Sequence, residues 1–230
     1  MKKLCIIPAR GGSKRLPGKN IRNLNGKPMV FYTIDSVLKS GLFDKVIFTS
    51  DDDVILEKVS SNYTIPILEI HKRPEELAGD TSKVINTVMH YLDEEYDQTW
   101  LTLPTSPLKT EEDFIQSSVL LTEDADSVIS FTEMEFPPTL GLVVKSNNIL
   151  EDYDQARPWR NGNTRSQDHP IVYRPNGAIY GGWTNRLRVN KNYYSDKTKG
   201  YFMPRNRSID IDTQFDFDMA SFYLGINNNK

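Results

Sequence analysis

The sequence contains a single cysteine, Cys5, in 230 residues. One thiol cannot form an intramolecular disulfide, so the fold must depend on its hydrophobic core, and a reducing compartment is expected. Cys5 lies in the first apolar run with no neighbouring group that would activate it, which predicts a buried thiol without a chemical role. The three histidines, His71, His90 and His169, lack metal-ligand spacing and are expected to be structural or to lie on the surface.

The chain also lacks a long apolar run and a strong net charge. The apolar stretch after Met1 is broken by Pro8 and Arg10, which is too short for a signal peptide or a membrane span. The formal net charge is −3, so no overall basic field would attract nucleic acid or an anionic membrane. We therefore expect a cytoplasmic protein whose partner is a small molecule and which binds neither nucleic acid nor membrane.

Positive charge is concentrated in one loop. The run Leu4–Ile7 predicts a first strand, and the stretch from 9 to 20 after it contains three glycines and four basic residues. Glycine lets backbone N–H groups approach an anion, and basic side chains supply the charge that a triphosphate needs. The spacing is not that of a Walker A loop, because Gly12 and Gly18 enclose one residue too many and Asn20 follows Lys19. We predict a nucleotide-phosphate loop of another type; the alternative is a basic surface loop without a ligand.

Strand-like and helix-like segments alternate through the first 130 residues or so. Amphipathic segments of helical spacing separate β-branched or aromatic runs at Lys45–Ser50, Ile65–Ile70, Trp100–Leu103 and Val128–Phe131. Helix N-caps are expected within Asp51–Asp53, with contact to a metal as the alternative role, and as a capping box of Thr110 with Asp113. The pattern predicts an α/β fold with a mostly parallel sheet, helices on both faces, and ligands beyond the carboxyl ends of the strands.

This alternation ends near Glu133. The following polar stretch, with a strand-like run at Leu140–Lys145, is typical of a lid, a binding arm or an oligomer contact. The turn-and-strand pattern returns at Arg174, and a last helix is expected with Asp212 as its N-cap.

A second charged motif covers Ser208–Thr213. On a strand, Asp210 and Asp212 would point the same way while Ile209 and Ile211 face the core. Two neighbouring carboxylates suit Mg²⁺, which binds one or two of them together with substrate phosphates. The sequence therefore favours a metal site here over the alternative of a solvated strand face.

Taken together, these segments resemble the bacterial acylneuraminate cytidylyltransferases, the CMP-sialic acid synthetases. The resemblance rests on Pro8–Lys14 with Lys19-Asn20, Arg73–Ala78, Pro104–Leu108, Arg174–Tyr180 and Ser208–Asp212, in the family's order across nearly the whole chain. It implies a mostly parallel, Rossmann-like nucleotidyltransferase sheet in a single cytidylyltransferase domain over residues 1–230. It also implies that residues 136–173 form a dimerisation and sugar-site arm, so that a homodimer is expected.

The resemblance further implies transfer of CMP from CTP to a nine-carbon keto-sugar acid, with Mg²⁺ as cofactor and pyrophosphate as the second product. The catalytic residues that it implies are Arg10, Lys19 and Asp210, and the metal ligands are Asp210 and Asp212. The implied nucleotide-binding residues are Ala9, Arg10, Gly11, Gly12, Ser13, Lys19, Asn20, Arg73 and Ser82. The implied sugar-binding residues are Leu103, Thr105, Ser106, Arg165, Gln167, Asn176 and Tyr180. Whether Asp210 or a metal-bound hydroxide acts as the base stays open.

One position departs from the family's pattern. Many sialic acid synthetases have Gln directly before the Pro-Thr-Ser-Pro segment, whereas this chain has Leu103. The apolar side chain removes a hydrogen-bonding group, which favours a legionaminic or pseudaminic acid derivative as the acceptor. The alternatives are another sugar nucleotidyltransferase, such as CMP-Kdo synthetase, and a non-catalytic nucleotide-binding protein on the same scaffold. The Arg165 region and the segment Asn176–Tyr180 argue against the first alternative. The presence of Arg10 and Lys19 together with the pair Asp210 and Asp212 argues against the second.

Overall fold

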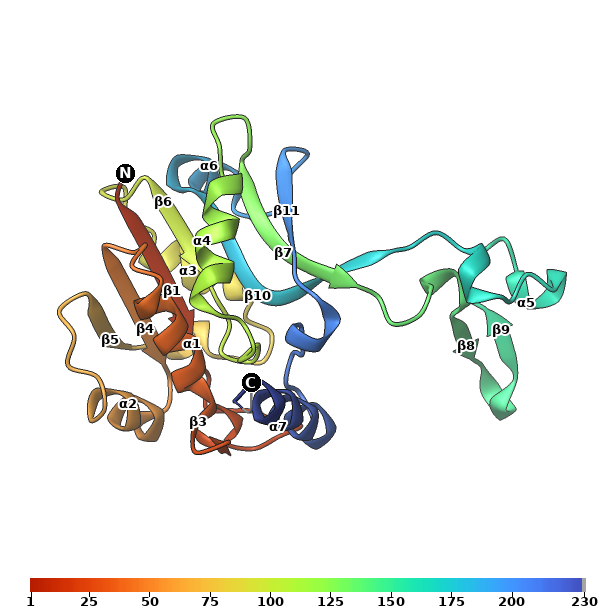
Figure 1. The fold of residues 1–230 in the computed structure, drawn as a ribbon, viewed down its shortest axis with the longest axis horizontal. Helices are drawn as coiled ribbons and strands as arrows, with labels where there is room; N and C mark the ends of the chain where they lie inside the picture. Colours follow the sequence, from red (N-terminus) through yellow and green to blue (C-terminus); the bar gives the residue numbers. More distant parts are fainter. Residues whose placement is uncertain (229–230) are drawn as a thin grey trace. The chain divides into compact units, whose positions relative to one another are not determined.

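The computed structural model describes residues 1–228 (Figure 1). The chain divides into two compact units, described here separately: residues 1–131 with the chain from Asn176 on, and Thr132–Pro175. A seven-stranded sheet has the order β11-β7-β10-β6-β1-β4-β5. Its strands are β1 (Lys3–Pro8), β4 (Lys45–Ser50), β5 (Leu68–Lys72), β6 (Gln98–Leu101), β7 (Ser127–Glu133), β10 (Tyr173–Trp183) and β11 (Thr198–Phe202).

The sheet is mostly parallel, as predicted. Strand β1 pairs in parallel with both β4 and β6, β4 pairs in parallel with β5, and β11 with β7, while β10 runs antiparallel to β6. Alternate side chains of β1 enter different hydrophobic clusters: Cys5 and Ile7 face one, Leu4 and Ile6 the other. All four are completely buried, so the predicted burial of Cys5 is confirmed.

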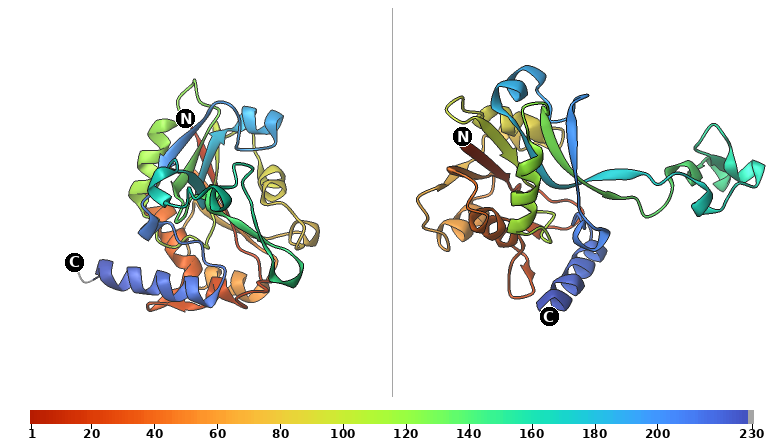
Figure 2. Two further views of the ribbon diagram at one scale, coloured as in Figure 1. Left: turned by 90° about the vertical axis from the view of Figure 1, so that its right-hand side faces the viewer. Right: turned by 45° about the horizontal axis from the view of Figure 1, so that its top comes forward.

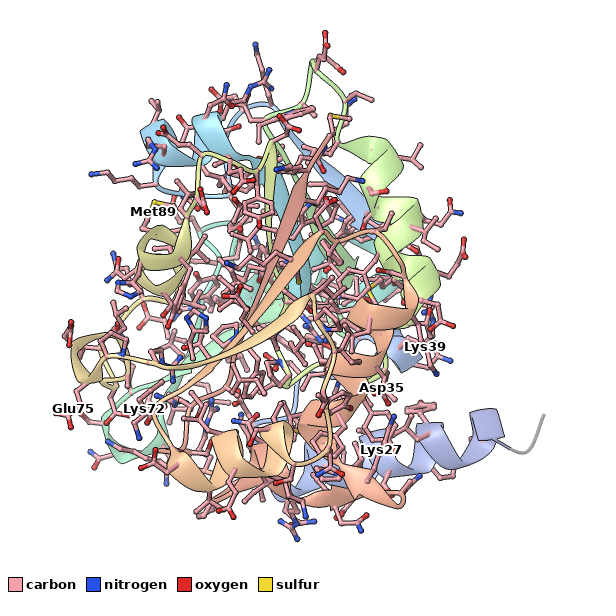
Figure 3. The ribbon with its side chains drawn as sticks, turned by 90° about the vertical axis from the view of Figure 1, so that its left-hand side faces the viewer. Lys27, Asp35, Lys39, Lys72, Glu75 and Met89 are labelled. Carbon is pink, nitrogen blue, oxygen red and sulfur yellow. The ribbon has the colours of Figure 1, made fainter. Side chains whose placement is uncertain are left out.

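Helices cover both faces of the sheet, which confirms the predicted architecture (Figure 2, left). Figure 3 shows the same division, with Met89 on one side of the sheet and Asp35 and Lys39 on the other. On one side lie α1 (Met29–Lys39), α2 (Asp53–Ser60) and α4 (Glu111–Leu120); on the other lie α3 (Val84–Tyr91) and α6 (Thr184–Asn190). No helix within residues 1–228 has the length and apolar character needed to cross a membrane.

Shorter elements connect these layers. A two-stranded ribbon consists of β2 (Asn23–Leu24) and β3 (Lys27–Pro28), and the last helix is α7 (Gln214–Asn228). Single 3₁₀ turns form η1 (Lys19–Ile21), η2 (Glu75–Leu77), η3 (Pro138–Leu140), η4 (Ser146–Asn148), η5 (Ser166–Asp168) and η6 (Arg205–Arg207).

Two of the predicted helix caps are confirmed and one is wrong. Asp52 accepts hydrogen bonds from Val54 N and Ile55 N at the start of α2, and Thr110 forms the expected capping box with Asp113. Asp212, in contrast, does not cap α7. The carboxylate that accepts from Thr213 N at this helix start belongs to Asp216, at 2.7 Å.

The strand expected at 208–212 is absent. This stretch follows η6 as irregular chain and is tied to the loop after β6 by a bond from Ile211 N to Thr105 O, 2.7 Å. The alternation of side chains survives in part, since Ile211 is fully buried while Asp210 and Asp212 reach a cleft. The third strand also lies later than expected, at β5 instead of 65–70, because β4 pairs with the chain from Leu68 to Lys72.

The second unit, Thr132–Pro175, contains the stretch predicted to be an arm and begins slightly before it. Its strands β8 (Leu142–Val144) and β9 (Leu150–Asp152) pair antiparallel, and α5 (Pro158–Asn161) follows. Many of its large apolar side chains are exposed, among them Phe136, Val144, Ile149, Leu150, Tyr153 and Ile171. An apolar surface of this density is typical of an interaction site.

Candidate active site

A cleft of about 280 Å³ lies beyond the carboxyl ends of β1 and β6. In the sheet, β4 lies on one side of β1 and β6, which comes later in the chain, lies on the other. The strand order therefore reverses at β1, and open α/β sheets bind ligands at such a reversal. Residues from well-separated parts of the sequence line it. Those predicted as site residues are Arg10, Lys19, Asn20, Arg73, Ser82, Leu103, Thr105, Asp210 and Asp212.

The glycine-rich loop after β1 is held by bonds to its surroundings. Asn20 Nδ2 donates to Arg10 O at 2.8 Å, and Gly11 N donates to Asp51 Oδ1 at 3.2 Å. A Cβ atom on Gly11 would lie 2.5 Å from Asp52 Oδ2, so this close approach requires glycine. Gly11, Gly12 and Ser13 line a hollow that shares Ala78 and Gly79 with the cleft, whereas Ala9 is buried and reaches neither.

Two aspartates share the four cations of this loop. Asp80 pairs with Arg10 at 3.3 Å and Lys14 at 2.6 Å, and Asp212 pairs with Arg15 at 2.6 Å and Lys19 at 2.9 Å. Most of these side chains are substantially exposed, and exposed ion pairs contribute little to stability. A phosphate group can therefore exchange with the carboxylates at small cost.

Lys19 differs from the other three cations because its side chain is only 11% exposed. Its Nζ donates to Ile211 O at 2.6 Å and to Asp212 Oδ1 at 2.9 Å. The phosphate loop and the aspartate motif, far apart in sequence, are thus joined directly by one cation.

Asp210 and Asp212 form a carboxylate pair at the cleft. Asp210 lines the cleft, but desolvation by the surrounding protein raises its pKa. The nearby negative charge of Asp212 raises this pKa further, whereas the hydroxyl of Thr105 lowers it. Because the charge of Asp212 disfavours ionisation of Asp210, a divalent cation beside both carboxylates would be favourable. Within residues 1–228, no group of three or more His, Cys, Asp or Glu side chains could hold a metal, so the other ligands would have to come from a substrate or water.

Arg73 lines the cleft from an anchored position. Its side chain is 6% exposed, and its Nη2 donates at 2.6 Å to Asp51 Oδ1, the atom that also accepts from Gly11 N. Desolvation would raise the pKa of Asp51, but these hydrogen bonds and the charge of Arg73 outweigh it and hold the pKa below its ordinary value. The sequence suggested only capping or a metal contact for Asp51, because nothing local indicates its partner Arg73.

Buried polar atoms without hydrogen-bond partners concentrate at this site. Among residues 1–228 such atoms are Ser13 Oγ, Asn20 Oδ1, Arg73 Nε, Ser82 Oγ and Thr132 Oγ1. All except Thr132 belong to residues that line the cleft or the adjoining hollow. Buried polar groups are almost always paired, so this clustering indicates groups arranged for a polar ligand.

Of the predicted sugar-binding residues, only Leu103 and Thr105 line this cleft. Ser106 and Asn176 are buried, with Ser106 Oγ donating to Asn176 O at 3.1 Å. The amide of Asn176 accepts from Ser130 Oγ at 2.6 Å and donates to Ser208 Oγ at 2.9 Å. Their side chains therefore lie beneath the cleft surface.

Tyr180, Arg165 and Gln167 complete the set. Tyr180 is half-buried against Tyr193, with ring centroids 5.8 Å apart, and burial followed by the charge of Asp210 raises its pKa. Arg165 and Gln167 belong to the second unit, where Gln167 lines a hollow together with His169.

A buried lysine, Lys109, was missed by the sequence reasoning. Its Nζ lies 2.8 Å from each of three oxygen atoms, Thr33 Oγ1, Leu103 O and Ser106 O. Burial, with no ion-pair partner among residues 1–228, lowers its pKa to about 7. The available signal was a cation at the end of an otherwise uncharged run, Leu103–Leu108.

Comparison with known proteins finds similarity over nearly the whole chain. A family model described as cytidylyltransferase matches residues 4–223. A pseudaminic acid cytidylyltransferase of Campylobacter jejuni is 31% identical over all of this chain and 99% of its own length. A CMP-N,N'-diacetyllegionaminic acid synthase of Legionella pneumophila is 32% identical over 99% of this chain and 98% of its own length.

Two further matches differ in extent or in closeness. An N-acylneuraminate cytidylyltransferase of Streptococcus agalactiae is 35% identical over 94% of this chain, which spans about half (52%) of that longer protein. The solved structure of a CMP:2-keto-3-deoxy-manno-octonic acid synthetase complexed with CTP superposes with a TM-score of 0.70. It covers 99% of this chain and 100% of its own, and at 17% identity it supports the fold alone.

Proposed function

This chain is a member of the cytidylyltransferase family, and from that premise we propose that it transfers CMP from CTP to a nonulosonic acid and releases pyrophosphate. The observation that carries the proposal is the cleft in which the phosphate loop, Arg73 and the Asp210–Asp212 pair meet among unpartnered buried polar atoms. Relatives matched over nearly their full length carry names for pseudaminic and legionaminic acid substrates. A non-catalytic nucleotide-binding role would not require the aspartate pair.

The nucleotide is proposed to lie along the loop after β1. Arg10 and Lys19 neutralise the phosphates by exchanging their aspartate partners for phosphate oxygens, and the backbone of Gly11 and Gly12 allows close approach. Asn20, Arg73 and Ser82 each offer an unpartnered buried atom to the nucleoside. Phosphoryl transfer depends mainly on positioning and charge neutralisation, so these residues need no covalent nucleophile.

Asp210 and Asp212 are proposed to hold Mg²⁺ together with phosphate oxygens. The ion would supply positive charge beside the reacting phosphate. Asp210, whose pKa is raised, is also suited to accept the proton of the acceptor hydroxyl from its position on the cleft.

The first experiment measures pyrophosphate release with CTP and Mg²⁺ against N-acetylneuraminic, legionaminic, pseudaminic and Kdo acceptors, repeated with ATP, GTP and UTP. We expect release with CTP and a nonulosonic acid that carries a methyl group where sialic acid carries a hydroxyl, because Leu103 presents an apolar side chain to the cleft. The expected preference over N-acetylneuraminate is about 10- to 100-fold in kcat/KM, the range for apolar discrimination.

The variant Leu103→Gln tests the same residue. It should reduce the preference for the methyl-bearing acceptor over N-acetylneuraminate, because it restores a hydrogen-bonding side chain at this position. The specificity assignment fails if N-acetylneuraminate gives the highest kcat/KM in the panel. Pyrophosphate release with Kdo alone would mean that Kdo, and not a nonulosonic acid, is the acceptor. No pyrophosphate release with any acceptor would overturn the proposed reaction.

We further propose that the second unit mediates a homodimer. Its exposed apolar side chains support this, since an isolated soluble chain rarely carries so many on a short segment. Light scattering after size exclusion should give twice the mass of one chain, and Val144→Asp should yield monomers. Val119→Asp is the matched control, because Val119 on α4 is exposed to a similar extent, 67% against 64%, but lies in the first unit. A monomeric wild type, or equal dissociation by both variants, would contradict the assignment.

A further inference from the structure

The loop between β6 and α4 forms the wall of the cleft that carries Leu103 and Thr105. It contains no strand or helix, so its shape depends on individual bonds. On one side Ile211 N, between the two aspartates, donates to Thr105 O at 2.7 Å, and Thr105 lines the same cleft as Asp210 and Asp212. The position of this wall is therefore coupled to the aspartate pair.

On its other side the loop is held by Lys109. Two carbonyl oxygens of the loop, Leu103 O and Ser106 O, each lie 2.8 Å from Lys109 Nζ and bracket Pro104 and Thr105. The third acceptor is Thr33 Oγ1 on α1, the helix that follows the phosphate loop. One ammonium group thereby links the nucleotide side of the site to its acceptor side.

The charge of Lys109 is costly where it lies. The residue is 2% exposed, and its three partners are two carbonyls and a hydroxyl instead of a carboxylate. Burying a cation without a counter-ion is unfavourable, and a methionine would fill similar space without that cost. An ammonium has three N–H donors, and here three oxygen acceptors lie at the same distance, which indicates that the residue serves to fix these oxygens.

We propose that Lys109 is a positioning residue for acceptor transfer, an inference that rests on the proposed cytidylyltransferase function. By fixing Leu103 O and Ser106 O, it holds Leu103 and Thr105 in place beside Asp210. The acceptor hydroxyl then meets the nucleotide phosphate in a defined orientation. Lys109 itself does not line the cleft, so it would act on the substrates only through this loop.

The test compares Lys109→Met and Lys109→Arg in the full-length protein by steady-state kinetics and by calorimetric CTP binding. Lys109→Met should lower kcat by about 10- to 100-fold, the range for a small misplacement of reacting groups. Its CTP affinity should stay within about threefold, because two of the lost bonds lie on the acceptor side and the third partner, Thr33, is buried and does not line the cleft. Lys109→Arg keeps a charged donor and should recover most of the loss.

Thr99→Val is the control for stability alone. It removes a buried 2.9 Å hydrogen bond to Thr184 Oγ1 from the same strand, β6, without touching the loop. If Thr99→Val lowers Tm as much as Lys109→Met does but leaves kcat unchanged, the result supports a positioning role for Lys109. An equal fall in kcat in the control, or a folded Lys109→Met with kcat within about twofold of wild type, overturns it.

Thr33→Val covers the case in which Lys109→Met does not fold. It removes one acceptor from Lys109 Nζ and keeps the lysine, so kcat should fall about 3- to 10-fold. Unchanged kcat in this variant also overturns the inference. A wild type inactive with every nonulosonic acid would instead refute the proposed function, which separates the two failures.

Discussion

Asp212→Ala should lower turnover by about 10³-fold or more, because it removes one of two carboxylates proposed to hold Mg²⁺ beside the phosphates. Binding of CTP without metal should respond differently. Asp212 pairs with Arg15 and Lys19, and its loss frees both cations for phosphate oxygens. Metal-free CTP affinity should therefore equal or exceed that of wild type. Pyrophosphate release at saturating CTP and Mg²⁺, together with calorimetry in EDTA, measures the two effects separately.

Asp218→Ala is the matched control for this variant. Asp218 is an exposed aspartate on α7 whose carboxylate accepts a local bond from Gln214, so its removal should leave turnover unchanged. Unchanged turnover in Asp212→Ala would remove the assignment of the metal pair. Loss of both turnover and metal-free CTP binding would indicate instead that Asp212 organises the phosphate loop.

The site features that the sequence predicts well are those with local causes. A buried strand followed by a glycine-rich, cationic loop places Arg10 and Lys19 at the carboxyl edge of a parallel sheet, and that edge is where the cleft lies. The capping box of Thr110 with Asp113 likewise depends on residues three apart and forms as expected. Elements of this kind require no knowledge of distant partners.

Features that depend on distant partners could not be predicted. Asp212 is a reasonable helix cap by local rules, but Lys19 and Arg15, almost 200 residues earlier, engage its carboxylate, and Asp216 accepts from Thr213 N instead. Lys109 would be placed on the surface by composition alone, since lysine is rarely buried. Its burial follows from three oxygens supplied by α1 and the loop after β6, which only the folded chain brings together.

Lys19→Met should reduce kcat/KM for CTP by about 10²- to 10³-fold, whereas Lys14→Met should cost only about 2- to 5-fold. The two residues belong to the same loop and carry the same charge, but their side chains are 11% and 78% exposed. Water and salt screen the exposed ammonium, while the buried one acts through a lower effective dielectric and from a position fixed by Ile211 O.

The salt dependence of these two losses distinguishes their causes. Raising ionic strength to about 0.5 M should remove most of the Lys14→Met defect and leave most of the Lys19→Met defect, because only the former arises from screened surface charge. Losses of similar size and similar salt sensitivity would mean that the loop attracts the triphosphate through its summed charge. Lys19 would then have no special place in the site, and its bonds to Ile211 O and Asp212 would be structural. A large, salt-resistant defect in Lys19→Met alone fits a cation placed to serve both the phosphates and the aspartate pair.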